Sequence, residues 1–218
     1  MPNSRPDGFL SVPTVGSGAP VLVLHAWWGL NDTIRGICAR LAEEGFVAFA
    51  PDLYHGKVTN SVAEAETLVR ALNRDPDHSE AVLAEAARFV TEHADRSDRG
   101  LAVIGFSLGA NFALDVAVGN PENVRSVVLF YGTSGGDFSA SKAAYLGHFA
   151  ENDPFEPRSE VDNLEQSLER AGRPVTFHHY AGAGHWFFEP DRADSYDAEA
   201  AQLAWDRTLA FLKRPADG

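Results

Sequence analysis

Short apolar runs alternate with segments of helical periodicity along most of the chain. The run at 21–25 is short, apolar and rich in β-branched residues, as a strand buried on both faces is. By the same criterion we expect strands at 46–50, 101–104, 124–130, 145–150 and 175–180, with an edge strand at 9–12. The apolar runs therefore predict a sheet of several strands.

Between these runs, apolar residues recur every three or four positions, which predicts helices. Asn31 and Asp32 can cap the helix that follows them, and Gly45 can end it. Helices are expected over 34–42, 62–72, 82–90, from near Ser107 to 118, 159–170 and 197–212. Repeated alternation of strand and helix predicts an α/β fold, with a mainly parallel, twisted sheet covered by helices on both faces.

In such sheets ligands bind beyond the carboxyl ends of the strands, so the loops there are the place to look for chemistry. No linker, repeat or low-complexity segment divides the 218 residues. We therefore expect a single domain over 1–218, with a loose tail from about 214 to 218.

Composition and charge argue against some classes of binding partner. Hydrophobic residues make up 44% and charged residues 22%, a globular balance, and the formal charge of −13 disfavours nucleic acid and anionic membranes as partners. The start of the chain lacks the pattern of a signal peptide, and no apolar run has the length of about 20 residues that a membrane helix needs. The single cysteine, Cys38, excludes an intramolecular disulfide and fits a reducing, cytoplasmic setting. No metal-ligand spacing or phosphate-binding loop is present, so we expect no metal site.

One loop carries a nucleophile motif. The expected strand 101–104 is followed by Gly105-Phe-Ser-Leu-Gly109, the G-x-S-x-G pattern. Small residues two positions before and after a serine allow a strand to turn sharply into a helix, which lifts the hydroxyl out of the sheet. The pattern alone occurs by chance with appreciable frequency, but its place between a strand and a helix predicts Ser107 as a nucleophile.

A serine needs a base, and His185 is the expected one. It follows Gly182-Ala-Gly184 after the last expected strand, at the end of the sheet where Ser107 lies. The base in turn needs an acid, which in hydrolases with this elbow lies between serine and histidine in the sequence. Asp153, directly after the strand at 145–150, is the first choice, with Asp137 and Glu151 as alternatives.

An oxyanion hole needs two backbone N–H groups. We expect one from Leu108, directly after the nucleophile, and the other from Trp27 in the loop after 21–25. Aromatic residues gather in the same loops and could wall an apolar pocket, although some of them could equally belong to the core. The expected pocket residues are Trp28, Tyr54, Phe106, Tyr131, Phe155 and Trp186.

The chain resembles the dienelactone hydrolase family within the α/β-hydrolase superfamily. The resemblance rests on His25-Ala-Trp-Trp-Gly-Leu-Asn31, Pro51-Asp-Leu-Tyr54, the elbow, Asn152-Asp-Pro-Phe155 and Gly182-Ala-Gly-His185, in this order. It implies an α/β-hydrolase fold without a large lid, a Ser107–Asp153–His185 triad and no cofactor.

Three departures from the family pattern bear on the substrate. The better-known members have cysteine where this chain has Ser107, and a glutamate that engages it where this chain has Ala26. Members acting on dienelactone hold the substrate carboxylate with arginines, one of them four residues past the histidine, where this chain has Glu189. A carboxylate there is expected to repel an anionic substrate.

The sequence therefore predicts an esterase that cleaves neutral, apolar carboxylic esters through an acyl-enzyme. Two alternatives stay open. One is hydrolysis of dienelactone-like lactones, as by a carboxymethylenebutenolidase. The other, of a different class, is a non-catalytic binding module with the hydrolase fold.

Overall fold

The computed structural model describes residues 5–15, 18–95 and 99–214. The chain forms two compact units, Met1–Leu101 and Ala102–Gly218, and each is described by itself. Of the expected tail, only Arg214 is among the described residues, and it is exposed. The single domain over 1–218 stays a prediction.

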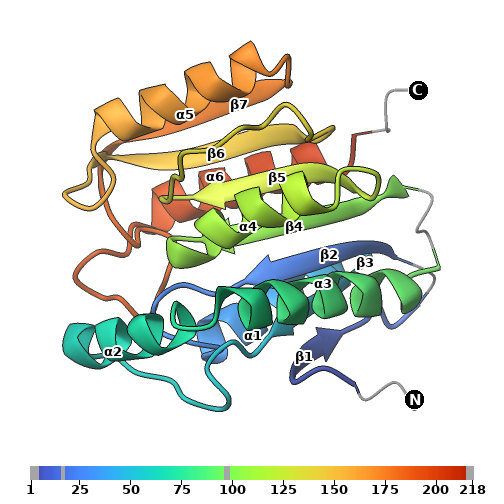
Figure 1. Cartoon of the computed structure of the whole chain (residues 1–218). Coiled ribbons are helices and arrows are strands. Elements are labelled where there is room, and N and C mark those ends of the chain that lie inside the picture. The colour runs from blue at the N-terminus through green and yellow to red at the C-terminus, as the bar shows by residue number, and fades with distance from the viewer. Residues whose placement is uncertain (1–4, 16–17, 96–98, 215–218) are drawn as a thin grey trace. The chain divides into compact units, whose positions relative to one another are not determined.

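The N-terminal unit contains three strands in the order β1-β3-β2 (Figure 1). They are β1 (Gly8–Ser11), β2 (Ala19–Leu24) and β3 (Phe46–Pro51). β2 runs parallel to β3, whereas β1 pairs antiparallel to β3, with Phe9 opposite Ala50. The expected edge strand at 9–12 is therefore present, one residue earlier than predicted.

The three expected helices of this unit are present, but the third begins at Pro76 rather than at 82, because proline is accommodated in the first turn of a helix. They are α1 (Asp32–Glu43), α2 (Val62–Leu72) and α3 (Pro76–Glu92). The Asn31 side chain accepts the N–H of Ile34 and caps α1, and the Asp75 side chain caps α3 in the same way by accepting from His78. Gly45, with φ of +90°, turns the chain after α1. Helices α3 and α1 cover opposite faces of β2 and β3 (Figure 1).

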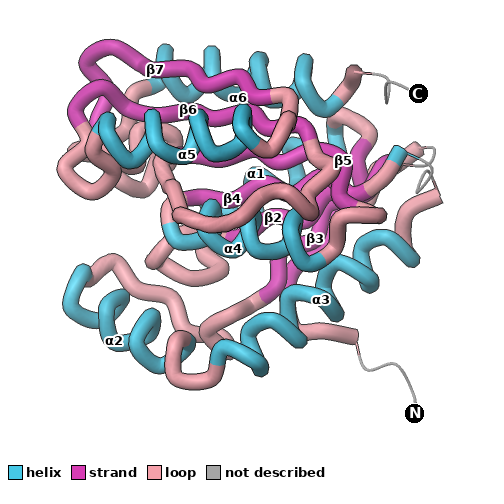
Figure 2. The backbone as a smooth tube through the Cα atoms, turned by 45° about the horizontal axis from the view of Figure 1, so that its top comes forward, coloured by secondary structure: helices cyan, strands magenta, loops and turns pink. Residues whose placement is uncertain are grey.

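The C-terminal unit contains four strands in the order β4-β5-β6-β7 (Figure 2). They are β4 (Leu101–Phe106), β5 (Val124–Phe130), β6 (Ala144–Asn152) and β7 (Val175–Gly184), and β5, β6 and β7 are parallel. Helices α4 (Leu108–Gly119) and α5 (Arg158–Arg170) cover one face, and α6 (Ala198–Leu212) covers the other. The loops that follow β5, β6 and β7 therefore lie at one edge of this part of the sheet.

The last two strands run further than the sequence indicated. We expected β6 to end at residue 150 and β7 at 180, with Gly182-Ala-Gly184 as a loop. Instead Asn152 of β6 pairs with Gly184 across a register shift, so residues 182–184 belong to β7. An irregularity of this kind lets pairing resume beyond a local break in the ladder. It places His185 directly at the end of a strand.

The two parts together confirm a mainly parallel α/β architecture, and no inserted lid domain occurs among the described elements. The strands are lined by fully buried residues such as Val21, Phe49, Val103 and Leu129. Within the ranges that the structure describes, no helix is long and apolar enough to cross a membrane.

Candidate active site

Ser107 occupies a sharp turn between β4 and α4. Its φ of +50° and ψ of −114° are unusual for a residue with a side chain, a conformation that costs about 1–3 kcal/mol and occurs mainly at functional sites. The Ser107 N–H donates to the carbonyl of Phe130 at 2.9 Å, which ties the turn to the end of β5. A Cβ at position 105 would overlap the carbonyl oxygen of Gly109, so the close approach of strand and helix requires glycine there.

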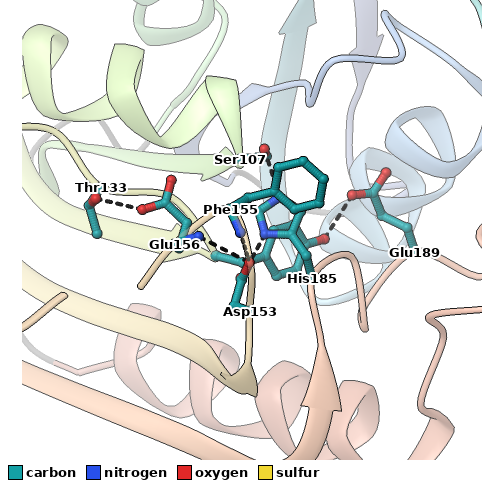
Figure 3. A network of polar contacts seen from close by, with 8 residues as sticks. Ser107, Thr133, Asp153, Phe155, Glu156, His185 and Glu189 are labelled. Carbon is teal, nitrogen blue, oxygen red and sulfur yellow. Dashed lines mark hydrogen bonds and ion pairs between the residues drawn. The ribbon is translucent and has the colours of Figure 1, made fainter. Parts of the chain in front are cut away.

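Ser107, His185 and Asp153 form a continuous line of hydrogen bonds (Figure 3). The Ser107 Oγ lies 3.0 Å from His185 Nε2, and His185 Nδ1 lies 2.7 Å from Asp153 Oδ2. An ionised carboxylate can only accept, so Nδ1 carries the imidazole proton and Nε2 is left to accept from the serine hydroxyl. Only 4% of the His185 side chain and 2% of the Asp153 side chain are exposed, so water is largely kept from the pair.

Backbone groups fix the orientation of Asp153. Its Oδ1 accepts the N–H groups of Phe155 and Glu156 at 2.9 and 3.0 Å, which leaves Oδ2 for His185. The carboxylates considered as alternatives are bonded elsewhere. Asp137 accepts from the N–H of Ser139, and Glu151 accepts from the N–H of Gly182.

The two predicted oxyanion donors lie in different units. Leu108 is the first residue of α4, so its N–H has no acceptor four residues earlier within the helix. Trp27 is partly buried in the loop between β2 and α1 of the N-terminal unit. Its role as the second donor stays a prediction.

Aromatic rings surround the imidazole of His185. The ring centroids of Tyr131, Phe155 and Trp186 lie 5.0, 5.0 and 4.7 Å from it. Phe155 is 48% exposed despite this contact, so it presents an apolar surface beside the imidazole. Phe106, in contrast, is 1% exposed and stacks on Phe130 at 4.6 Å, within the core.

The remaining predicted pocket residues belong to the N-terminal unit. Trp28 and Tyr54 are 2% and 4% exposed. The Tyr54 ring packs edge-on against His25 at 4.9 Å, and burial raises the pKa of its hydroxyl. Contact of these two residues with a substrate stays a prediction.

The environment of Glu189 differs from the one expected from the sequence. It is fully buried, and its Oε1 accepts a hydrogen bond from the Tyr131 hydroxyl at 2.9 Å. Burial raises the pKa of its carboxyl group to about 8, so at neutral pH most molecules carry it uncharged. The expected repulsion of a substrate carboxylate by Glu189 therefore does not follow, because the charge on which it depended is largely absent.

A second acid, the half-buried Glu156, was not predicted from the sequence. Its Oε2 accepts from the hydroxyl of Thr133 at 2.6 Å, next to Asp153 (Figure 3). Burial raises the pKa of Glu156 to about 7. No sequence signal could identify this pair, because its two members come from different loops and neither belongs to a motif.

No group of three or more potential metal ligands occurs among the residues that the structure describes. Cys38 is buried in α1, and burial raises the pKa of its thiol to about 12, which makes it a poor nucleophile.

The mainly parallel sheet and the serine on its strand-to-helix turn define the class, an α/β-hydrolase. Residues 7–215 match the family model described as "Dienelactone hydrolase family". The chain belongs to the dienelactone hydrolase family.

Named relatives agree with this assignment. The chain is 33% identical to "Protein usf" of Aquifex pyrophilus over 94% of this chain and 92% of that one. It is 30% identical, with the same coverage of both chains, to a protein of Aquifex aeolicus named "Putative carboxymethylenebutenolidase". A crystal structure titled "Putative Dienelactone Hydrolase" from Klebsiella pneumoniae matches with a TM-score of 0.78 and 26% identity, covering 95% of this chain and 92% of that one. The family assignment establishes a hydrolase.

Proposed function

We propose that this hydrolase cleaves neutral, apolar carboxylic esters through an acyl-enzyme formed on Ser107. The observation that carries the proposal is the hydrogen-bonded line from the Ser107 hydroxyl through His185 to Asp153. A serine hydroxyl is a weak nucleophile by itself, and this arrangement supplies both a base and a group that holds the base in the required tautomer.

In the proposed reaction, Ser107 Oγ attacks the ester carbonyl carbon while its proton moves to His185 Nε2. Asp153 stabilises the imidazolium that forms. The amide of Leu108 stabilises the oxyanion, with that of Trp27 as the predicted second donor. When the tetrahedral intermediate collapses, the carbon–oxygen bond to the alcohol breaks and His185 returns the proton to the leaving alkoxide. A water molecule then attacks the acyl carbon while its proton moves to His185 Nε2. The bond from this carbon to Ser107 Oγ breaks, His185 returns the proton to Oγ, and the carboxylic acid leaves.

The preference for neutral, apolar esters rests on two features. Phe155 exposes an apolar ring at contact distance from His185, where it can pack against an apolar part of the substrate. The formal charge of −13 disfavours the approach of anions. Glu189 does not contribute to this preference, because burial keeps it largely uncharged at neutral pH.

Hydrolysis of an anionic, dienelactone-like lactone is the second candidate. The relative from Aquifex aeolicus bears the name of such an enzyme, and the buried state of Glu189 removes one objection to an anionic substrate. A panel that pairs a neutral ester with an anionic lactone of similar size separates the candidates. We expect a higher kcat/KM for the ester, and a strong preference for the lactone would favour the second candidate.

Labelling with a fluorophosphonate tests the nucleophile directly. We expect the folded protein to gain one adduct on Ser107, identified by mass spectrometry of the digested protein, because the hydroxyl has an adjacent base. The Ser107→Ala variant should gain none. Absence of labelling in the folded wild type, together with failure to hydrolyse any ester, would instead favour a non-catalytic binding module.

Replacement of Phe155 tests the apolar surface beside the imidazole. We expect Phe155→Ala to lower kcat/KM for a butyl or hexyl ester about 5- to 20-fold, mainly through KM, because loss of an apolar contact costs about 1–2 kcal/mol. The bond from its backbone N–H to Asp153 does not depend on the side chain. Leu203→Ala is a matched control, since Leu203 is 45% exposed on α6. An equal loss in both variants would remove Phe155 from the binding surface.

A further inference from the structure

Tyr131 has an unusual backbone conformation directly after β5. Its φ is +37°, although it is a bulky residue, and its side chain is fully buried. Its N–H donates to the carbonyl of His148 at 2.9 Å, which fixes its position at the end of the sheet. Such a conformation persists only where the surrounding structure imposes it, and it is commonly associated with function.

The residues on either side of Tyr131 hold the backbone of the nucleophile. On one side, the carbonyl of Phe130 accepts the Ser107 N–H at 2.9 Å. On the other, a Cβ at Gly132 would overlap the Ser107 carbonyl oxygen, so this segment lies directly against the elbow. Any displacement of Tyr131 along the sheet edge is therefore transmitted to Ser107.

The side chain of Tyr131 lies against His185, the partner of Ser107. Its ring lies 5.0 Å from the His185 ring, and its hydroxyl donates to Glu189 Oε1 at 2.9 Å. Glu189 ends the turn that begins at His185, and its N–H donates to the carbonyl of Trp186 at 3.0 Å. In Figure 3 a dashed line marks the hydrogen bond that the Glu189 carboxyl accepts.

We propose that Tyr131 and Glu189 are positioning residues that set the separation between the Ser107 hydroxyl and the His185 imidazole. A single residue, Tyr131, therefore links Ser107 and His185. Its backbone segment lies against the serine, and its side chain lies against the turn that begins at His185. This inference rests on the proposed function for its effect on catalysis, whereas the buried hydrogen bond itself is independent of it.

The charges around Glu189 explain why the protonated form matters. Burial is the main reason that its pKa lies at about 8, Asp191 acts in the same direction, and the Tyr131 hydrogen bond and Arg192 oppose the shift. Burial, Glu189, Asp191 and Asp153 also raise the pKa of the Tyr131 hydroxyl. The phenol therefore does not ionise in place of Glu189. Glu189 Oε2 has no hydrogen-bond partner among the described residues. An ionised Glu189 would therefore be a poorly compensated buried charge, and the turn must move to solvate it.

The kcat of ester hydrolysis as a function of pH tests this arrangement. At pH 9, one unit above a pKa of about 8, about one molecule in ten keeps the Glu189 proton, so we expect the wild-type kcat to be about tenfold below its value at pH 7. In Glu189→Gln the amide oxygen still accepts from Tyr131 but the group no longer titrates. Its kcat at pH 7 should stay within about threefold of wild type, and the decrease at alkaline pH should be absent.

Tyr131→Phe keeps the ring beside His185 and removes only the hydroxyl. We expect kcat at pH 7 to fall about 10- to 100-fold with little change in KM, because a small misplacement of reacting groups has an effect of that order. Tyr145→Phe is the matched control. Tyr145 is also buried, and its hydroxyl is bonded to Ser141 at 2.6 Å, outside the proposed site. It should leave kcat and the pH profile unchanged.

The same alkaline decrease in wild type and Glu189→Gln, or an unchanged kcat in Tyr131→Phe, would overturn the proposal. If Tyr131→Phe does not fold, the comparison of wild type with Glu189→Gln still decides.

An unfolding measurement separates this outcome from a failure of the proposed function. The pKa of Glu189 is raised in the folded state, so its stabilising contribution is present below about pH 4.5 and is lost as pH rises toward 8. The urea midpoint of wild type should therefore fall more between pH 5 and 9 than that of Glu189→Gln. A larger fall in wild type without Ser107-dependent hydrolysis would refute only the proposed function, whereas an equal fall of the midpoint in the two proteins would refute the protonated Glu189.

Discussion

Replacement of Ser107 by alanine is expected to lower kcat/KM for p-nitrophenyl acetate and butyrate at pH 7 by at least about 10⁴-fold. The variant keeps the elbow, the predicted oxyanion donors and the His185–Asp153 pair, so we expect it still to bind substrate and to stabilise the developing charge. What it lacks is the atom that forms the acyl-enzyme in the proposed mechanism. Residual hydrolysis must then proceed by direct attack of water. It lacks the Ser107 Oγ, which lies 3.0 Å from His185 Nε2 in the wild type.

The measurement needs a control for folding and for the general effect of removing a hydroxyl. Ser167→Ala serves as the control, because Ser167 is a helix residue of α5 whose hydroxyl bonds only to local groups, the carbonyl of Asn163 and the side chain of Arg170. It should retain full activity, and both variants should unfold close to the wild-type midpoint. Activity of Ser107→Ala within about tenfold of wild type would eliminate the serine mechanism.

Most helices and strands could be predicted because the sequence signals for them are local. The spacing of apolar residues in α1, the Asn31 cap and Gly45 lie within one stretch of about 15 residues. The end of β7 could not be predicted in this way. Residues 182–184 contain two glycines, which are typical of a loop, but a register shift against β6 extends the ladder to them. Pairing with a distant strand outweighed local propensity there.

The candidate site was predictable for a related reason. Parallel strands end at one edge of a sheet, so a motif after β6 and a histidine after β7 are brought to the same place. Glu189 was misinterpreted because its charge state depends on burial and on Tyr131, which lies 58 residues away in the sequence. Position relative to a family motif indicates where a residue lies along the chain, but it does not indicate whether the residue faces the substrate or the core.

Replacement of Asp153 by asparagine is expected to lower kcat by about 10⁴-fold at pH 7, and the structure gives a specific reason. Asp153 Oδ1 accepts two backbone N–H groups, at 2.9 and 3.0 Å. In Asp153→Asn only the amide oxygen can take that place, so the amide nitrogen must occupy the position of Oδ2 and donate toward His185 Nδ1. The imidazole then carries its proton on Nε2, and Nε2 can no longer accept the proton of Ser107.

The tautomer can be measured as well as the rate. The nitrogen chemical shifts of His185 should indicate a proton on Nδ1 in wild type and on Nε2 in Asp153→Asn. Asp137→Asn and Glu151→Gln are matched controls, since each replaces an exposed carboxylate that bonds to a backbone N–H elsewhere. We expect both to keep kcat within about threefold of wild type. Loss of as much activity in Glu151→Gln as in Asp153→Asn, with folded stability unchanged, would instead assign the role of the acid to Glu151.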